Sequence, residues 1–217
     1  MWCCLVGSEM CIRDRHISVS VVHPNMLDEG WIFDESFSGA TKDHLYGSQY
    51  LRELYQRADQ NITTSVTVPI LWDKETETIV NNESSQIIRM FNSEFNELTN
   101  NYDDYYPEQH RSEINSLNDL IYETVNNGVY KSGFAKSQEA YEEAVTKLFE
   151  TLNKLEDRLS SSKYLIGENV TEADFRLIPT LLRFDAVYVT HFKCNLRRII
   201  DYKNLSRYVQ DLSLIHI

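Results

Sequence analysis

An acid and two hydroxyls come together at Glu83, Ser84 and Ser85, just before apolar residues at helical spacing. This pattern predicts the N-terminus of a helix, where backbone N–H groups are free and the helix dipole is positive. Such a terminus can hold a carboxylate or a phosphate, and Glu83 beside it can accept an ammonium group. One end of an amino acid would therefore fit there. The alternative is that these polar residues only cap the helix.

A strand-like run that contains a proline lies just upstream of this terminus. Residues 66–73 alternate and are rich in β-branched side chains, which predicts a strand, and Ile79 and Val80 would close a short hairpin. A proline in such a run cannot donate to a ladder, so it belongs at an edge, a bulge or a cis turn. We expect a cis peptide bond between Val68 and Pro69.

The combination of V-P with E-S at the next helix start resembles the glutathione site of thioredoxin-fold glutathione transferases. Further motifs occur in the order V-V-H-P, G-W-I-F-D, T-V-P-I-L-W-D, N-N-E-S-S-Q-I-I-R-M-F-N, N-G-V-Y-K-S-G-F-A and H-F-K-C-N. Together they resemble the glutathionyl-hydroquinone reductases, the Xi class, which are related to the Omega-class transferases. The resemblance extends from about Ile17 to about Leu212.

The resemblance implies that glutathione is the co-substrate, and it assigns parts of the glutathione site. Val68, next to Pro69, would pair its backbone with the cysteinyl unit of glutathione, while Glu83 and Ser84 would hold the γ-glutamyl end. Trp31 would form a wall of the pocket. From its sequence context alone, Trp31 could equally be a hydrophobic plug for its loop.

The second substrate, an aromatic glutathione conjugate, would bind to tyrosines of the C-terminal half. The resemblance places Tyr130 and His191 in a hydroquinone pocket. Tyr188 and Tyr202 are further candidates, but for these two the resemblance does not decide whether they belong to the pocket. Tyrosine supplies a flat apolar ring and a hydroxyl from one side chain, which suits a hydroquinone. The alternative for any one of them is a half-buried helix residue with a solvated hydroxyl.

The family reaction passes through a cysteine mixed disulfide. A thiolate attacks the sulfur of the glutathionyl-hydroquinone, hydroquinone leaves, and a second glutathione releases oxidised glutathione. The family's reactive cysteine lies in a C-P-W-A motif, which this sequence lacks. Cys3 and Cys4 have neither that proline nor a strand before them, so we assign no catalytic residue. Cys194 is expected to be a small buried residue, although Lys193 beside it could lower its pKa.

The elements that must position these residues divide into an α/β half and a helical half. Residues 16–96 predict the order strand, helix, strand, strand, helix, with the first strand at 16–22 and the first helix at 48–58. This is a thioredoxin-like α/β domain that lacks its first strand. Residues 97–106 are polar and acidic and predict a linker. Residues 107–212 predict the all-α C-terminal domain of a glutathione transferase.

Three helices are predicted in the all-α domain. The first opens at Pro107 and ends near residues 126–128, and the second covers residues 137–159. The third opens with a capping box, in which Asp174 follows Thr171 by three residues. Asp174 is therefore expected to be structural rather than catalytic.

The two ends of the chain differ in character from the rest. Residues 1–15 and 213–217 resemble translated adapter sequence and are expected to be non-native; the alternative is a natural tail. We expect the natural gene to encode a C-P-W-A motif upstream of His16 and more helix beyond Leu212. The chain expressed alone is expected to be inactive and prone to aggregation.

Composition limits the remaining function classes. The 217 residues are 42% hydrophobic and 12% aromatic, as in ordinary globular domains, and no apolar run could span a membrane. The net charge is −12, from 33 acidic and 21 basic residues without a basic stripe, which makes nucleic acid an unexpected partner. Cysteine spacing predicts neither a disulfide framework nor a metal site. A cytoplasmic location is expected, and a homodimer when the chain is full length.

Two other functions are compatible with a transferase fold. A non-catalytic transferase-like module could serve as an interaction surface, but it would not need the V-P, E-S and Y-K-S-G-F-A motifs. An Omega-like thiol transferase would act on another acceptor. The tyrosines and the H-F-K-C-N motif favour the hydroquinone reductase.

Overall fold

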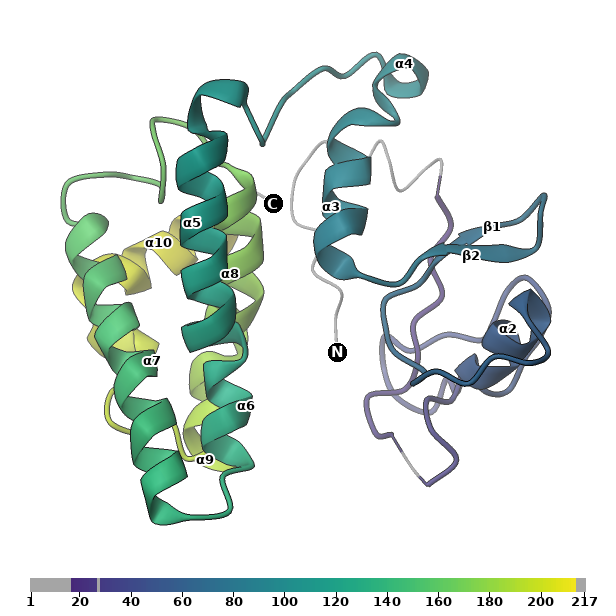
Figure 1. The fold of residues 1–217 in the computed structure, drawn as a ribbon, viewed down its shortest axis with the longest axis horizontal. Helices are drawn as coiled ribbons and strands as arrows, with labels where there is room; N and C mark the ends of the chain where they lie inside the picture. Colours follow the sequence, from purple (N-terminus) through teal and green to yellow (C-terminus); the bar gives the residue numbers. More distant parts are fainter. Residues whose placement is uncertain (1–16, 27, 214–217) are drawn as a thin grey trace. The chain divides into compact units, whose positions relative to one another are not determined.

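The computed structural model describes residues 17–26 and 28–213. They form two compact units, each with its own hydrophobic core, which divide between Asn101 and Tyr102 (Figure 1). The end segments expected to be non-native lie outside the described residues, except for Ser213, the last residue of a helix.

The first unit contains a small sheet with helices around it. Its elements are α2 Leu51–Ala58, β1 Leu71–Asp73, β2 Thr78–Asn81, α3 Ser84–Ser93 and α4 Asn96–Thr99. The two strands pair antiparallel, with Trp72 opposite Ile79. The hairpin and α3 are as predicted, whereas α4 lies partly in the segment predicted to be an irregular linker.

Two of the predicted strands are largely absent. Residues 64–70 belong to no ladder, so the predicted strand remains only as β1. The predicted strand at 16–22 also forms no ladder over its described residues; instead, the backbone N–H and C=O of Val21 bond to the hydroxyl and the amide of Thr41, both at 2.8 Å. A strand needs a neighbour for its backbone hydrogen bonds, and alternation in the sequence does not say whether one is available.

The core of the first unit forms around α2. Leu51, Leu54 and Tyr55 point from this helix against Val22 and Phe33. The helix begins three residues later than predicted, after Tyr50 at its N-cap. It holds the loop before it and the segment after it against one apolar cluster.

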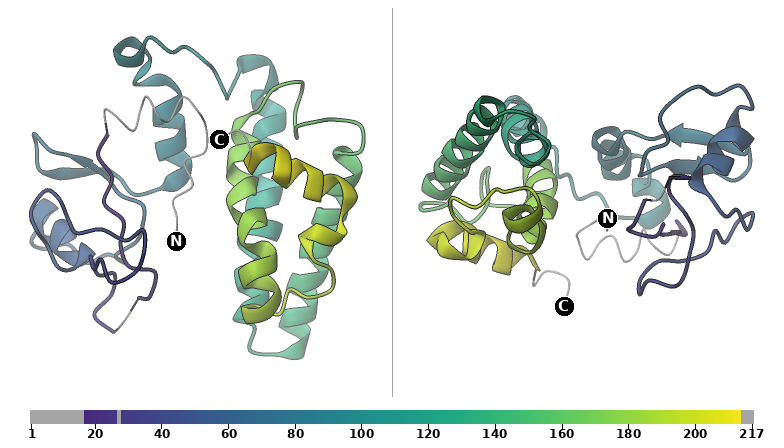
Figure 2. Two further views of the ribbon diagram at one scale, coloured as in Figure 1. Left: turned by 180° about the vertical axis from the view of Figure 1, so that it is seen from behind. Right: turned by 90° about the horizontal axis from the view of Figure 1, so that it is seen from below.

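The regular elements of the second unit are all helical, and loops connect them (Figures 1 and 2). Its elements are η1 Glu108–His110, α5 Arg111–Ile121, η2 Tyr122–Asn126, α6 Gly128–Gly133, α7 Gln138–Arg158, α8 Glu172–Arg183, η3 Phe184–Tyr188, α9 Val189–His191, η4 Ile199–Asp201 and α10 Lys203–Ser213. η1 and η4 are 3-10 turns, and η2 and η3 are π-helical. α5 packs against α8, and α7 packs against α6. The second and third predicted helices correspond to α7 and α8.

The predicted end of the first helix near residues 126–128 is wrong. Asn127 keeps helical dihedral angles, and the chain continues as α6 to Gly133. Gly128 is buried, and a Cβ built on it would lie 3.7 Å from Leu148 of α7. Packing between α6 and α7 therefore keeps this segment helical, although Asn and Gly usually end a helix.

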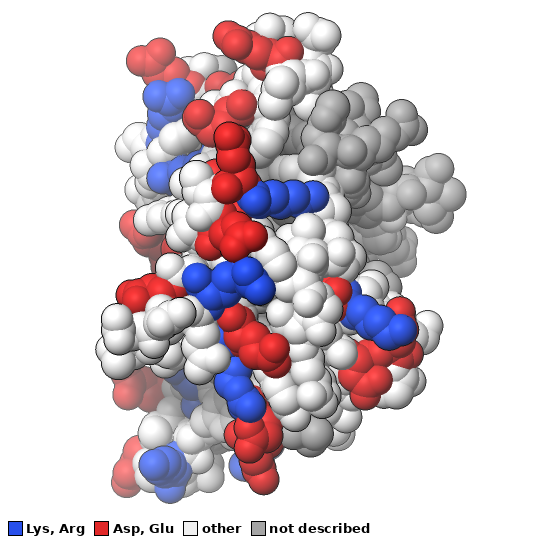
Figure 3. Space-filling model, turned by 90° about the vertical axis from the view of Figure 1, so that its right-hand side faces the viewer, with Lys and Arg blue, Asp and Glu red and all other residues white. Residues whose placement is uncertain are grey.

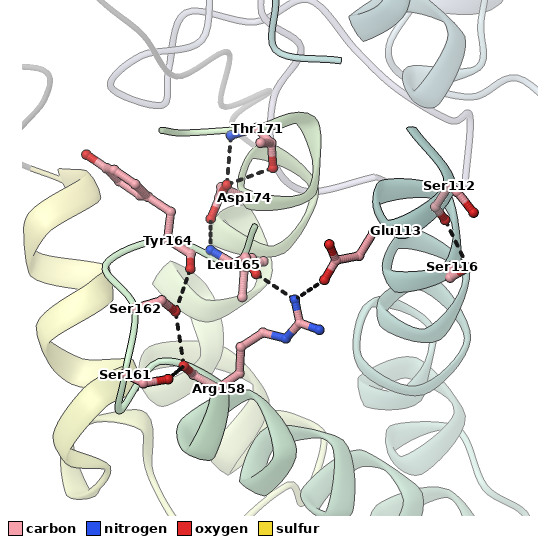
Figure 4. A network of polar contacts seen from close by, with 10 residues as sticks. All are labelled: Ser112, Glu113, Ser116, Arg158, Ser161, Ser162, Tyr164, Leu165, Thr171 and Asp174. Atoms are coloured by element: carbon pink, nitrogen blue, oxygen red, sulfur yellow. Dashed lines mark hydrogen bonds and ion pairs between the residues drawn. The ribbon is translucent and has the colours of Figure 1, made fainter. Parts of the chain in front are cut away.

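The N-terminus of α8 is tied to its surroundings through Asp174 (Figure 4). The carboxylate accepts from the amide and hydroxyl of Thr171 at 2.8 and 3.0 Å, and from the amide of Leu165 at 3.0 Å. The hydroxyl of Tyr208 in α10 donates to it at 2.8 Å. Arg158, at the end of α7, donates to the Leu165 carbonyl at 2.7 Å and to Glu113 of α5 at 2.9 Å. Asp174 thus has the structural role that the capping box predicts.

Charged side chains of both signs are interleaved on the face drawn in Figure 3 rather than gathered in a basic patch. Ion pairs of the first unit join Lys42 to Glu35, Arg52 to Glu29 and Arg57 to Glu77. Within the described residues, no helix is both long and apolar enough to cross a membrane.

Candidate functional site

The predicted ligand-binding helix terminus is the start of α3. Glu83 is its N-cap, and its Oε1 accepts from the Ser85 amide at 3.4 Å and from the Ser85 hydroxyl at 3.1 Å. The Glu83 amide donates to Asn81 Oδ1 at 2.7 Å. Glu83 and Ser84 are both exposed. Glu83 therefore caps the helix and still presents its carboxylate to solvent, so the capping role and a ligand role are compatible here.

The Val68–Pro69 peptide bond is cis, which confirms that prediction. Val68 is half-buried and packs against the core of the first unit. Trp31 packs against the same core, and its carbonyl accepts from the amide of Leu51 at 2.9 Å, where α2 begins. Its partial burial fits both interpretations of Trp31, as a plug for its loop and as a wall of a pocket.

Tyr55 of α2 connects the two stretches, a role that no pattern in the sequence indicates. Its ring is buried, and its hydroxyl lies 3.0 Å from the Thr67 carbonyl, 3.2 Å from the Thr67 amide and 3.4 Å from Asn82 Nδ2. Thr67 precedes Val68, and Asn82 precedes Glu83. The predicted residues of this site are thus held together by a residue that contacts their neighbours.

The second unit brings together Tyr130 of α6 and Tyr188 of η3. Their hydroxyl oxygens are 3.1 Å apart, and their rings meet edge to face at 5.7 Å. Phe192 contacts both rings edge to face, at 5.4 and 5.2 Å, and Phe134 lies against Phe192 at 5.5 Å. Flat apolar surface and two hydroxyls are therefore concentrated at one end of α6, as an aromatic ligand with a polar edge requires.

The hydroxyl of Tyr130 stays protonated across the physiological range. Burial raises its pKa to about 12, and the hydrogen bond with Tyr188 adds to the effect. Both effects disfavour a phenolate, because burial deprives the charged form of hydration and the hydrogen bond with Tyr188 favours the neutral form. Tyr130 is therefore a hydrogen-bond partner and not a base.

The chain is similar to known glutathione transferases in sequence and in structure. Residues 138–211 match the model of the glutathione S-transferase C-terminal domain. Glutathionyl-hydroquinone reductase YqjG of Escherichia coli K12 is 57% identical over 196 residues, which make up 90% of this chain and 60% of that protein. The glutathione-bound structure of YqjG has a TM-score of 0.90 at 54% identity, covering 94% of this chain and 68% of the other.

A second solved structure gives the class. Glutathione transferase Xi 1 from Trametes versicolor has a TM-score of 0.89 at 49% identity, and the match covers 94% of this chain and 74% of that one. This chain belongs to the Xi-class glutathione transferases. The expected family and fold class, a thioredoxin-like part followed by an all-helical transferase domain, are confirmed. The chain spans 60% of the length of its curated Escherichia coli relative.

The remaining candidates for the aromatic pocket of this Xi-class transferase differ in position. His191 is exposed at the end of α9, and it directly precedes Phe192 of the aromatic cluster in the chain. Tyr202 is fully buried between α7 and α10; its hydroxyl donates to Asn153 at 3.1 Å, and the Arg197 guanidinium lies 3.8 Å from its ring centre. The structure does not bring the hydroxyl of Tyr202 to the Tyr130–Tyr188 pair.

Cys194 is buried behind the cluster. Desolvation raises the pKa of its thiol to about 11, although Ser132 acts in the opposite direction. A thiol in this state is a poor nucleophile, and Lys193 beside it does not lower its pKa. Cys3 and Cys4 lie outside the described residues. Among the residues that the structure describes, no group of three or more His, Cys, Asp or Glu side chains is placed to hold a metal ion.

Proposed function

We propose that the full-length protein is a glutathione-dependent reductase that converts S-glutathionyl-hydroquinones into free hydroquinones. The observation that carries the proposal is the hydroxyl pair of Tyr130 and Tyr188 inside an aromatic cluster. A thiol transferase that acts on small disulfides has no need for such a surface. The name of the Escherichia coli relative, a glutathionyl-hydroquinone reductase, supports the same reaction.

Glutathione would bind to the first unit. The backbone of Val68, beside Pro69, would pair with the cysteinyl unit, as extended peptides do along an open strand edge. The γ-glutamyl end would meet the α3 terminus, where Ser84 would donate to its carboxylate and Glu83 would accept from its ammonium group. Trp31 would cover one side of the bound tripeptide.

The hydroquinone ring would bind to the second unit. The hydrogen bond between Tyr130 and Tyr188 uses one of their two protons. Because Tyr188 is buried and Tyr130 only half-buried, the O–H of Tyr130 would be the one that donates to a phenolic oxygen of the substrate. Phe192 would supply an apolar face, and the exposed His191, which precedes it in the chain, would lie at the rim of the bound ring. We leave Tyr202 out of this pocket because its hydroxyl is bound to Asn153.

The reaction would proceed in two balanced steps. A cysteine thiolate attacks the sulfur of the conjugate, the bond between sulfur and the ring carbon breaks, and the ring carbon takes a proton to give hydroquinone. A second glutathione thiolate then attacks the mixed disulfide, which releases oxidised glutathione and restores the cysteine thiolate. We assign the thiolate to none of the described residues, since burial holds Cys194 in its neutral form.

An Omega-like thiol transferase is the second candidate, and both use the same glutathione site. Either activity needs glutathione in its reduced form, so we place the protein in the cytoplasm. We also propose a homodimer, as the resemblance to the family implies. Glutathione is the co-substrate in both cases, and no step requires a metal.

Turnover of a synthetic glutathionyl-hydroquinone by the purified full-length protein tests the proposal. With glutathione present, chromatography should find hydroquinone and oxidised glutathione in a one-to-one ratio. A mixed disulfide of glutathione and a small thiol serves as the competing substrate. Reduction of this disulfide without reduction of the conjugate would favour the thiol transferase, and turnover of neither would refute both candidates.

A further inference from the structure

The hydroxyl of Tyr55 is used to its full hydrogen-bonding capacity. Tyr55 is 1% exposed and projects from α2 into the core of the first unit. Its O–H donates to the Thr67 carbonyl at 3.0 Å, and its oxygen accepts from the Thr67 amide at 3.2 Å and from Asn82 Nδ2 at 3.4 Å. A phenol has one proton and two lone pairs, and each is engaged. The hydroxyl oxygen of Thr67 also lies 3.4 Å from the Tyr55 hydroxyl oxygen.

The partners of Tyr55 are the residues that immediately precede the two stretches of the glutathione site. Thr67 precedes Val68 and Pro69, and Asn82 precedes Glu83, the N-cap of α3. The β1–β2 hairpin separates these stretches in the chain. The hydroxyl of Tyr55 therefore links the segment that enters the hairpin to the segment that leaves it.

A ligand that contacts both stretches binds more tightly when their spacing is set beforehand. If the stretches move independently, binding must order them, and this cost is subtracted from the interaction energy. Supporting side chains that are locked by packing and hydrogen bonds remove that cost. Tyr55 is such a side chain, because its ring is held in the core while its hydroxyl reaches the backbone of the site.

We propose that Tyr55 is a positioning residue for glutathione, whose hydroxyl sets the distance between the Val68 backbone and the N-terminus of α3. This inference rests on the proposed function, since it assumes that glutathione contacts both stretches. Packing alone does not require the hydroxyl, because a phenylalanine ring would fill the same space. The role of the hydroxyl can therefore be separated from the role of the ring.

The test compares Tyr55→Phe with Tyr46→Phe in the full-length protein. Tyr46 is a matched control: it packs against the same core, and its hydroxyl accepts a hydrogen bond from Trp72 Nε1 at 3.1 Å, without bonding to Thr67 or Asn82. Glutathione binding is measured by calorimetry and stability by thermal unfolding. Because several hydrogen bonds are lost, Tyr55→Phe should weaken glutathione binding about tenfold. The KM for glutathione should rise by the same factor, while kcat at saturating glutathione should stay within about twofold of the wild-type value. Tyr46→Phe should bind as the wild type does.

Asn82 provides a second variant that does not disturb the core, because its side chain is exposed. Asn82→Ala should weaken binding by about threefold, the effect of one hydrogen bond, and this loss should disappear in the Tyr55→Phe background. If Tyr55→Phe does not fold, Asn82→Ala alone decides: unchanged affinity overturns the inference.

The outcomes distinguish a failure of the proposed function from a failure of the role proposed for Tyr55. A wild-type protein that does not bind glutathione overturns the proposed function and the inference with it. A wild type that binds, together with equal affinities for Tyr55→Phe and Tyr46→Phe, overturns the inference and leaves the proposed function intact.

Discussion

The hydroxyl oxygens of Tyr130 and Tyr188 lie 3.1 Å apart, although the residues are 58 positions apart in the sequence. α6 supplies one and η3 the other, and Phe192 contacts both rings. A pair of hydroxyls has two protons and uses only one between its oxygens, so one O–H remains for a ligand. The two hydroxyls therefore act together as a single hydrogen-bond donor.

Removing either hydroxyl should therefore cost nearly as much as removing both. A hydrogen bond contributes roughly 0.5–1.5 kcal/mol, so Tyr130→Phe and Tyr188→Phe should each lower kcat/KM for the conjugate by about 2- to 10-fold. The double variant should be little worse than either single one. Steady-state kinetics measures the effect, and the glutathione Kd, which should not change, is the control. Fully additive losses would show that the two hydroxyls act separately.

Tyr202→Phe distinguishes a packing role from a role in the pocket. The substitution removes the hydrogen bond to Asn153, so the free energy of unfolding should fall by about 1 kcal/mol. Asn153→Ala should have a similar effect, and urea unfolding measures both. A loss of kcat/KM as large as that of Tyr130→Phe would place Tyr202 in the substrate pocket after all.

Glu83 and Ser84 should hold the γ-glutamyl end of glutathione. Each hydrogen bond to a charged group contributes on the order of 1.5–3 kcal/mol, so the double variant Glu83→Ala, Ser84→Ala should weaken glutathione binding at least tenfold. Glu83→Ala also removes the cap of α3, whereas Glu83→Asp keeps a capping carboxylate. Calorimetry on the double variant, on Glu83→Ala and on Glu83→Asp separates the loss of the helix cap from the loss of the contacts with glutathione. If the double variant retains wild-type affinity, these residues only cap the helix.

The two glycines of α6 should respond to alanine in opposite ways. A Cβ on Gly133 would lie 2.2 Å from Cδ1 of Phe192, so Gly133→Ala must displace that ring and should destabilise the fold by about 1–3 kcal/mol. A Cβ on Gly128 would meet Leu148 at an ordinary 3.7 Å, so Gly128→Ala should be tolerated and gain helix propensity of up to about 1 kcal/mol.

Thermal unfolding of both glycine variants checks this contrast. Gly133→Ala should also raise KM for the conjugate, because Phe192 contacts both tyrosines. Equal stabilities of the two variants would contradict the assigned packing of Phe192.

Asp43 should make stability depend on pH in the acid range. Burial, the largest single influence, raises its pKa, but donors including the amides of Leu45 and Ser48, at 3.0 Å each, together outweigh it and lower the pKa below its usual value. A carboxyl group with a lowered pKa stabilises the fold fully above its unfolded pKa of about 3.9, and this contribution is lost as the pH falls through the folded value.

Urea unfolding of the wild type and of Asp43→Asn at pH 7 and near pH 3 tests this prediction. The variant keeps one acceptor oxygen but cannot ionise, so the difference in unfolding free energy should be larger at pH 7 than at pH 3. If the difference in unfolding free energy does not change with pH, the ionised form of Asp43 does not stabilise the fold.

Features that depend on neighbouring residues in the chain were predictable. The cap of α3, the bounds of α7 and the capping box of Thr171 and Asp174 all follow from short-range spacing. The cis bond at Pro69 was also indicated by its place in a strand-like run.

Features that depend on residues far apart in the chain were not predictable from the sequence. The strand predicted at 16–22 and the first part of the strand predicted at 66–73, as far as residue 70, lack ladder partners over their described residues, and alternation cannot reveal that. Gly128 continues a helix because Leu148 packs on it from α7. Tyr55 gave no signal because a buried tyrosine on a helix is ordinary, and only the three-dimensional arrangement shows what its hydroxyl reaches.

The four donors to Asp174 have a consequence for how the helical unit opens. Two come from Thr171 at the same helix end, but the others come from Leu165 in the preceding loop and from Tyr208 in α10. If α10 detached by itself, a buried carboxylate would lose a donor, which is costly. We therefore expect α10 and the start of α8 to open to solvent together, as one cooperative unit rather than as a fraying end.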